Sequence, residues 1–263
     1  MTLDTTFFGA AALGLAAAAG AALAFLVWLA SLPLRDVSIV DSVWSFLVWL
    51  PAAVTAAELP HAGPRALPLL LLTLVWALRL SVHIAVRQHG QPEDRRYQAI
   101  RARNQPHFEW KSLFLVFGLQ ALLGWIVAAP VMAGAASAAP WRELDLVGLA
   151  LMAFGLAFEA VADAQLAHFK ADPTQRGRVL DTGLWRYSRH PNYFGECCMW
   201  WGAWLVGAAA GAWWTIFSPL LMTVLLLKVS GVALLEKDIG RRRQGYAEYV
   251  RRTNAFVPGR PRP

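Results

Sequence analysis

Apolar positions in this chain gather into long uninterrupted runs and do not alternate with polar positions. A helix needs about 20 apolar residues to cross the hydrocarbon core of a bilayer, whereas a transmembrane barrel strand shows about 10 residues of alternating polarity. The pattern therefore predicts about seven membrane helices, at Phe7–Ala30, Ser38–Ala57, Ala66–Val86, Ser112–Ala139, Leu144–Val161, Tyr193–Ala209 and Ala212–Leu235.

The ends of these runs add two expectations. The first run is preceded by neither Lys nor Arg and is too long for a signal-peptide core, so we expect a retained membrane helix. The small residues Gly207 to Gly211 fit either a tight turn between the last two helices or a packing stretch within one bent helix.

Composition supports a membrane protein, because 57% of the residues are hydrophobic and only 16% are charged. The two cysteines, Cys197 and Cys198, are neighbours in an apolar run, which excludes a disulfide framework. No repeat and no long linker divides the chain. We expect an all-α, polytopic membrane helix bundle that forms a single integral membrane domain over residues 1–263.

The basic residues predict the orientation of this bundle. With the N-terminus outside, Arg65 and Arg142 fall on the outer side, Arg79 and Lys228 fall within helices, and the other 20 of 24 Lys and Arg fall on the inner side. Short cytoplasmic loops carry such an excess. This predicts a cytoplasmic C-terminus, and it explains the positive charge without a nucleic-acid partner.

Ionisable side chains inside a bilayer are costly unless they pair or face water, so each is a candidate functional residue. Arg79 and His83 are four residues apart and share one helix face. Structural pairing, for example of Asp41 with Arg79, is the alternative interpretation. The candidates within the predicted helices are Asp41, Arg79, His83, Glu159, Asp163, Glu196, Lys228 and Glu236.

A second stripe runs along the fifth predicted helix toward the inner surface. Glu159, Asp163 and Lys170 lie at helical spacing, with the acids deeper and the lysine at the end. Such an acidic-to-basic gradient suits an elongated ligand that has a hydroxyl-rich part and an anionic end.

The segment from Gly183 to Glu196 carries most of the polar chemistry. Arginine side chains at 186 and 189 and the imidazole of His190 suit phosphate, and Pro191 starts a helix whose free backbone N–H groups add to anion binding. The alternative is an interfacial loop whose arginine and aromatic side chains lie among lipid headgroups. Further along, Arg241 to Arg243 suit either a phosphate or anionic lipid.

These residues bear a resemblance to known families. The motif Arg189–Glu196, with Glu236, Tyr246–Tyr249 and Phe256–Pro258, resembles the C-terminal half shared by membrane steroid 5-alpha-reductases, sterol reductases, and isoprenylcysteine and phospholipid methyltransferases. The upstream residues Trp76–Leu80, His83, Arg87 and Glu93–Tyr97 resemble a bacterial branch of uncharacterised proteins that is classed with the 5-alpha-reductases. The resemblance covers most of the chain after Asp36. The bacterial inner membrane is the location that the resemblance implies.

The resemblance implies an NADPH site in the half from 144 to 258, and a substrate side formed by helices and loop between 36 and 110. It implies no metal. The glycine-rich dinucleotide fingerprint is missing, so the site would not be a Rossmann site. Residues expected to bind the cofactor are Asp163, Lys170, Arg186, Tyr187, Arg189, His190, Asn192, Tyr193, Glu196, Glu236, Tyr246 and Tyr249, and those expected to act in catalysis are Asp41, Arg79, His83 and Tyr193.

The function expected on this basis is NADPH-dependent reduction of a carbon–carbon double bond in a lipophilic enone or sterol-like substrate. The alternative is an S-adenosylmethionine-dependent methyltransferase of the lipid or isoprenylcysteine type. Two departures from the families matter. The steroid 5-alpha-reductases have a Gln-Glu pair in the second helix and a tyrosine in the third, where this chain has Asp41 and then Arg79 with His83. The methyltransferases commonly have Glu-Glu where this chain has Glu236-Lys237.

Overall fold

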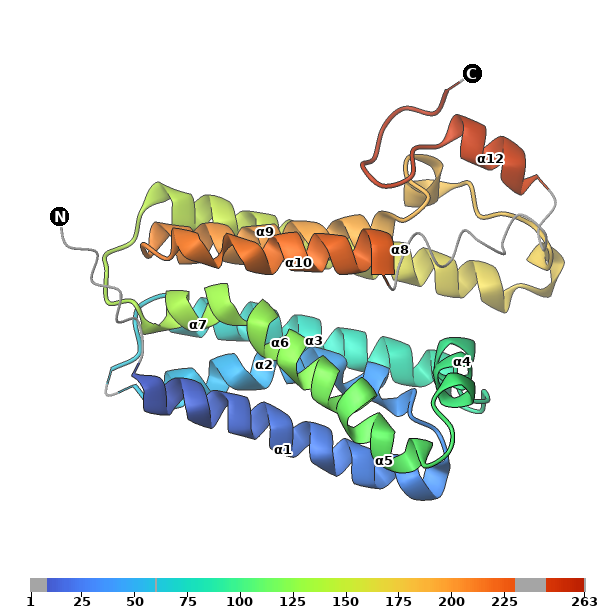
Figure 1. Cartoon of the computed structure of the whole chain (residues 1–263). Helices are drawn as coiled ribbons and strands as arrows, with labels where there is room; N and C mark the ends of the chain where they lie inside the picture. The colour runs from blue at the N-terminus through green and yellow to red at the C-terminus, as the bar shows by residue number, and fades with distance from the viewer. Residues whose placement is uncertain (1–8, 60, 230–244, 263) are drawn as a thin grey trace. The chain divides into compact units, whose positions relative to one another are not determined.

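The computed structural model describes residues 9–59, 61–229 and 245–262 (Figure 1). Secondary structure in those ranges is helical, without a strand. The helices are α1 (Ala10–Leu34), α2 (Ile39–Ala57), α3 (Ala66–Gln88), α4 (Arg95–Arg103), α5 (Phe108–Ser112), η1 (Leu113–Gly118), α6 (Leu119–Val127), α7 (Ala129–Ala136), α8 (Glu143–Ala171), η2 (Pro173–Gln175), η3 (Gly183–Arg186), α9 (Pro191–Ala209), η4 (Trp213–Ile216), α10 (Phe217–Val224), η5 (Leu225–Val229) and α12 (Tyr246–Arg252).

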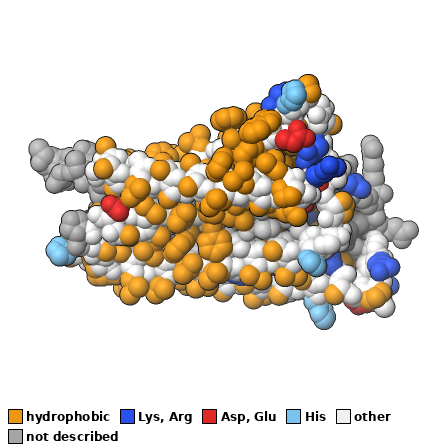
Figure 2. Space-filling model, turned by 90° about the horizontal axis from the view of Figure 1, so that it is seen from below, with side chains coloured by type: hydrophobic (Ala, Val, Ile, Leu, Met, Phe, Trp, Pro, Cys, Tyr) orange, Lys and Arg blue, Asp and Glu red, His pale blue; other side chains and the backbone are white. Residues whose placement is uncertain are grey.

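Five helices are long and apolar enough to cross a membrane: α1, α2, α3, the continuous run Phe108–Val127, and α8. Large apolar side chains on their surfaces are exposed, including Leu67 and Val86 at 68% and 71%. Figure 2 shows a face covered largely by hydrophobic side chains, with charged ones gathered toward one end. These features fit a multi-pass membrane protein in contact with lipid. The count of seven and the orientation of the termini stay predictions.

The helix bounds differ from the prediction in places that have physical causes. The predicted helix Ser112–Ala139 begins earlier, at Phe108, and is interrupted at Ala128, because Pro130 lies in the first turn of a new helix that begins at Ala129. Helix α8 continues ten residues beyond Val161, to Ala171. A turn follows α9, and Gly211 has a φ of 99° that favours glycine. The tight-turn alternative for this stretch is therefore confirmed.

One turn of the run Phe108–Val127 is wider than an α-helix. Residues Leu113–Gly118 form the π-helix η1, and the N–H of Leu119 reaches the carbonyl of Phe114, five residues back. A π-turn inserts one extra residue into a helix. It therefore sets which way α6 faces, starting with Leu119 and Gln120.

The described chain divides into two compact units. The described residues of unit 1 fall within 1–142 and 206–215, and those of unit 2 fall within 143–205 and 216–263. In unit 1, α2 packs against α1, α3 and α6. A buried apolar core includes Trp28, Leu47, Phe108 and Phe117.

Helices α8 and α9 of unit 2 pack through glycines. A Cβ on Gly195 would lie 2.6 Å from the backbone nitrogen of Glu159, and one on Gly155 would lie 2.5 Å from the carbonyl oxygen of Gly195. Small residues allow such close backbone approach between membrane helices. The glycine of the Asn192–Glu196 stretch thus brings the first turn of α9 against the acidic part of α8.

Candidate functional site

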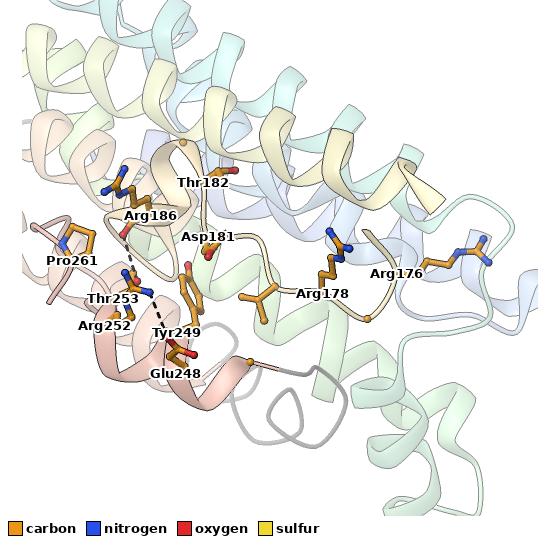
Figure 3. A pocket seen from close by; sticks show the side chains of 14 residues that line it. Arg176, Arg178, Asp181, Thr182, Arg186, Glu248, Tyr249, Arg252, Thr253 and Pro261 are labelled. Carbon is orange, nitrogen blue, oxygen red and sulfur yellow. Dashed lines mark hydrogen bonds and ion pairs between the residues drawn. The ribbon is translucent and has the colours of Figure 1, made fainter. Parts of the chain in front are cut away.

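Unit 2 contains a cavity of about 880 Å³ (Figure 3). Its walls come from the loop after α8, from η3, from α12 and from the C-terminal tail. The size lies within the range of about 300–1,000 Å³ that is usual for small-molecule sites. The labelled lining residues are Arg176, Arg178, Asp181, Thr182, Arg186, Glu248, Tyr249, Arg252, Thr253 and Pro261.

Positive charge predominates in this cavity. Four arginines line it, together with two carboxylates, Asp181 and Glu248. Arg252 and Glu248 form an ion pair at 3.5 Å, but both side chains are more than half exposed, so the pair contributes little to stability. The guanidinium groups present planar forks that match phosphate or carboxylate oxygens. The cavity is therefore suited to an anionic ligand.

A clasp between two chain segments holds the walls together. The hydroxyl of Tyr249 donates to the carbonyl of Trp185 at 2.5 Å, and the hydroxyl of Ser188 donates to the carbonyl of Phe256 at 2.7 Å. The backbone N–H of Gly259 donates to the carbonyl of Tyr187 at 3.0 Å. Each bond joins residues 185–188 to the C-terminal segment, so the cavity depends on this docking.

Arg189 belongs to the same clasp. Its guanidinium donates to the carbonyls of Val250 and Thr253, at 3.1 and 2.9 Å, and its backbone N–H donates to the carbonyl of Asn254. These carbonyls lie at the end of α12, where the helix leaves its last acceptors without intrahelical partners. Arg189 therefore has a clear structural role, and its predicted contact with phosphate stays untested.

Buried polar groups gather where α9 meets α8. Asn192 donates from Nδ2 to the carboxylate of Asp163 at 3.1 Å, and the rings of His190 and Tyr193 stack with centroids 5.7 Å apart. The Oδ1 atom of Asn192 is buried without a hydrogen-bond partner among the described residues. The buried ionisable members of this α8–α9 polar cluster are Glu159, Asp163, His190 and Glu196.

The segment 183–196 borders both the cavity and the polar cluster, and α8 fixes its start. Gln165 accepts from the backbone N–H of Leu184 at 3.0 Å, and the indole N–H of Trp185 donates to the carbonyl of Ala162. Gly183 has a φ of 59°, and a Cβ there would lie 2.6 Å from the Gln165 side chain. No pattern in the sequence singles out Gln165, since glutamine near a helix end is common.

Most of the predicted cofactor residues lie in this part of unit 2. Arg186 and Tyr249 line the cavity, while Asp163, His190, Asn192, Tyr193 and Glu196 form or border the polar cluster. Tyr187 is exposed, Lys170 is exposed near the end of α8, and Tyr246 is buried beside Tyr249. Glu236 lies outside the described residues. Sequence reasoning missed the lining arginines Arg176, Arg178 and Arg252, which it counted only as inner-side charge.

A second polar group lies in unit 1 around Asp41. Its carboxylate accepts from the Arg96 guanidinium at 2.7 Å and from the Tyr97 hydroxyl at 2.6 Å. Gln120 donates to the Tyr97 oxygen at 2.9 Å. The partner of Asp41 is therefore Arg96 on α4, and not the Arg79 weighed as an alternative.

The other candidate catalytic residues lie on α3. Arg79 and His83 are partly buried and one turn apart, as the spacing predicted. The hydroxyls of Ser45 on α2 and Ser81 on α3 are 2.9 Å apart, so polar side chains meet where these two helices pack. Nothing in this geometry assigns catalysis to either residue.

Acidic residues just before α4 are held ionised. Burial alone would raise the pKa of Glu93, but its hydrogen bonds from Arg101 and from the backbone N–H of Val37 lower it overall. Burial would also raise the pKa of Asp94, but the hydrogen bonds and the positive charge of Arg96 outweigh this effect and lower the pKa overall. Burial first, and then the Asp41 charge, raise the pKa of Tyr97 far above its ordinary value. Tyr97 is a neutral donor to Asp41.

Comparison with known proteins places the chain in a family. The family described as "Protein of unknown function (DUF1295)" matches residues 27–253. A relative from Schizosaccharomyces pombe, described as an uncharacterized protein, is 26% identical over an alignment that covers 73% of this chain. The chain spans only 64% of the length of that relative. No solved structure gives a significant match. Because the family match extends over most of its length, this chain belongs to the DUF1295 family.

Proposed function

We propose that the protein is a membrane-embedded, NADPH-dependent reductase of a carbon–carbon double bond in a lipophilic enone or sterol-like substrate, related to the steroid 5-alpha-reductases. The observation that carries this proposal is the arginine-lined cavity of unit 2, which one chain segment links to a buried cluster of hydrogen-bonding side chains. A long ligand with several phosphates at one end and neutral polar groups elsewhere matches both features.

The residues fit the parts of NADPH. Four arginines suit its pyrophosphate and its 2′-phosphate, for which bidentate guanidinium contacts are favourable. The buried Oδ1 of Asn192 is an acceptor for an N–H or O–H group, as in a carboxamide or a ribose. Asp163, whose carboxylate already orients Asn192, can accept from ribose hydroxyls. The polar cluster thus offers hydrogen-bond acceptors that suit the donor groups of a dinucleotide.

Reduction adds a hydride and a proton across the double bond, and bound NADPH supplies the hydride. The protein holds the reacting groups in place and excludes water, which strengthens each electrostatic contact. We assign Tyr193, on the first turn of α9 beside Asn192, as the hydroxyl that orients the polar end of the substrate. Among the predicted catalytic residues of unit 1, the Asp41 carboxylate already accepts from Arg96 and Tyr97. A guanidinium such as that of Arg79 does not release its proton in proteins, so the imidazole of His83 has the chemistry that best suits a proton donor.

Cofactor-dependent stabilisation of the detergent-purified protein tests the proposal. We expect NADPH, at about 100-fold above its dissociation constant, to raise the unfolding free energy by about 2.7 kcal/mol. The double variant Arg178→Gln/Arg186→Gln should lose this protection. The matched control Arg251→Gln removes an exposed arginine that does not line the cavity, and should keep it. Equal protection of the double variant would contradict the assignment of the cavity.

One observation favours a second function, methyl transfer from S-adenosylmethionine. Glu159, Asp163 and Glu196 are all buried in the polar cluster, and carboxylates suit a sulfonium cation. The arginine-lined cavity gives that cofactor no advantage, since it carries no phosphate. Protection by S-adenosylmethionine with none by NADPH would replace the reductase by the methyltransferase.

A further inference from the structure

One end of unit 1, formed by α4, α5 and the loop before them, is rich in charge. Residues 87–111 contain six basic side chains, which fall into two groups according to what they contact. Arg96 and Arg101 turn toward the unit, and the other four are exposed. The two groups have different roles.

The inward group is neutralised by acids of the same unit. Arg96 pairs with Asp41 at 2.7 Å and with Asp94 at 2.9 Å. Arg101 pairs with Glu93 at 2.7 Å and lies over the ring of Phe108, 4.6 Å from its centroid. The carboxylates of Asp41, Glu93 and Asp94 are thus all paired with arginine.

The outward group comprises four exposed cations, and residues 87–111 contain one exposed carboxylate. Along α4, Arg95, Ala99, Ala102 and Arg103 are all exposed and fall on one helical stripe. Glu109 is the exposed acid beside them. We define the α4–α5 basic surface by the exposed residues Arg95, Arg103, Trp110 and Lys111 of these two helices, together with Arg87 at the end of α3 and Phe114 in η1.

Exposed aromatic side chains border the charges. Trp110 is 66% exposed, although its ring contacts Trp28 with centroids 5.3 Å apart, and Phe114 is 75% exposed one turn further along. Lys111 lies between them in sequence. Tryptophan at the edge of a membrane helix marks the headgroup level, and basic residues at that level attract anionic lipid.

We propose that the α4–α5 basic surface binds the headgroups of anionic phospholipids, with Trp110 and Phe114 inserted among the acyl chains beside them. Charge complementarity selects this partner, because the inward acids are already paired and the outward side chains are cationic. The exposed aromatic rings favour a lipid over a water-soluble anion, because a lipid also offers an apolar environment. This site is independent of the cavity in unit 2.

The test uses the full-length protein in nanodiscs of phosphatidylcholine alone or mixed with phosphatidylglycerol. Each basic residue near an anionic surface favours binding about fivefold, so the triple variant Arg95→Gln/Arg103→Gln/Lys111→Gln should lose roughly a hundredfold in preference for phosphatidylglycerol. Native mass spectrometry measures the retained lipid, and thermal unfolding measures the stabilisation that the lipid confers. High salt should reduce both effects.

Arg251→Gln in α12 is the matched control and should retain the wild-type preference. Unfolding in phosphatidylcholine should be the same for all three proteins, which shows that the variants are folded. The proposal is overturned if the wild-type protein does not distinguish the two lipids. It is also overturned if the triple variant keeps the full preference, because anionic lipid would then bind elsewhere.

Discussion

Arginine has opposite surroundings beside the acids of unit 1 and in the cavity of unit 2. In unit 1, Arg96 and Arg101 each contact a carboxylate at 2.7 Å and are mostly covered, with 32% and 25% of their side chains exposed. In unit 2, the arginines of the cavity outnumber its carboxylates by four to two, and Arg186 and Arg252 are exposed. Paired and covered charges hold a structure together, whereas exposed charges of one sign are available to a ligand. Arginine therefore stabilises the structure beside Asp41 and Glu93, and is a candidate ligand-binding residue in the cavity.

The sharpest test replaces one arginine in each unit by a residue of similar length. Arg96→Met leaves Asp41 and Asp94 without their cation, and we expect it to lower the unfolding free energy by about 3 kcal/mol. Arg186→Met should change stability by less than about 0.5 kcal/mol, since its exposed side chain lines an open cavity. Denaturant unfolding in detergent measures both. Equal losses would remove the distinction between the two units.

A second test concerns the frame of unit 2. Gly195→Ala places a methyl group 2.6 Å from the Glu159 nitrogen, and we expect a loss of about 2 kcal/mol as α8 and α9 separate. The control is Gly14→Ala on α1, where no atom lies within 4 Å of the added Cβ and a small stabilisation is expected from helix propensity. If Gly195→Ala has the wild-type unfolding free energy and still binds the cofactor, close packing of α8 and α9 does not position the polar cluster.

The smallest effect is expected from acid. Glu93 has a lowered pKa in the folded protein, so its pairing with Arg101 stabilises the fold above the ordinary glutamate pKa of 4.5 and is lost as the pH falls through the lower folded value. A double-mutant cycle with Glu93→Gln and Arg101→Met should give a coupling of about 1 kcal/mol at neutral pH. The coupling should approach zero in acid. A coupling that does not depend on pH would mean that packing on Phe108, and not charge, holds Arg101.

Sequence patterns were sufficient for the helical class, for the membrane location and for most helix starts. Apolar length decides these features locally, so Ala66 was placed as the first residue of α3. The spacing of Glu159 and Asp163 placed both acids on one stripe of α8, but it did not predict that Asn192 contacts Asp163. The contact between Asn192 and Asp163 follows once the glycines bring the two helices together.

Other features depend on contacts between distant residues, and no local pattern reveals them. Asp41 pairs with Arg96, 55 residues away, because α4 folds back onto the start of α2. Arg65, counted in the sequence as an outer-side charge, is fully buried and donates to the carbonyls of Ala139 and Pro140. The clasp between residues 185–189 and the C-terminal segment is likewise made largely through backbone carbonyls, which carry no sequence signal.

The π-helix Leu113–Gly118 has a consequence for chain length. Deleting one residue there would restore α-helical winding and rotate everything on one side of it by about 100° relative to the other. After such a deletion, the contact of Trp110 with Trp28 and the hydrogen bond of Gln120 to Tyr97 are mutually exclusive, because they lie on opposite sides of the π-helix. A relative that is shorter by one residue at this place must surrender one of these two contacts, whereas a shortening in the loop before α5 spares both.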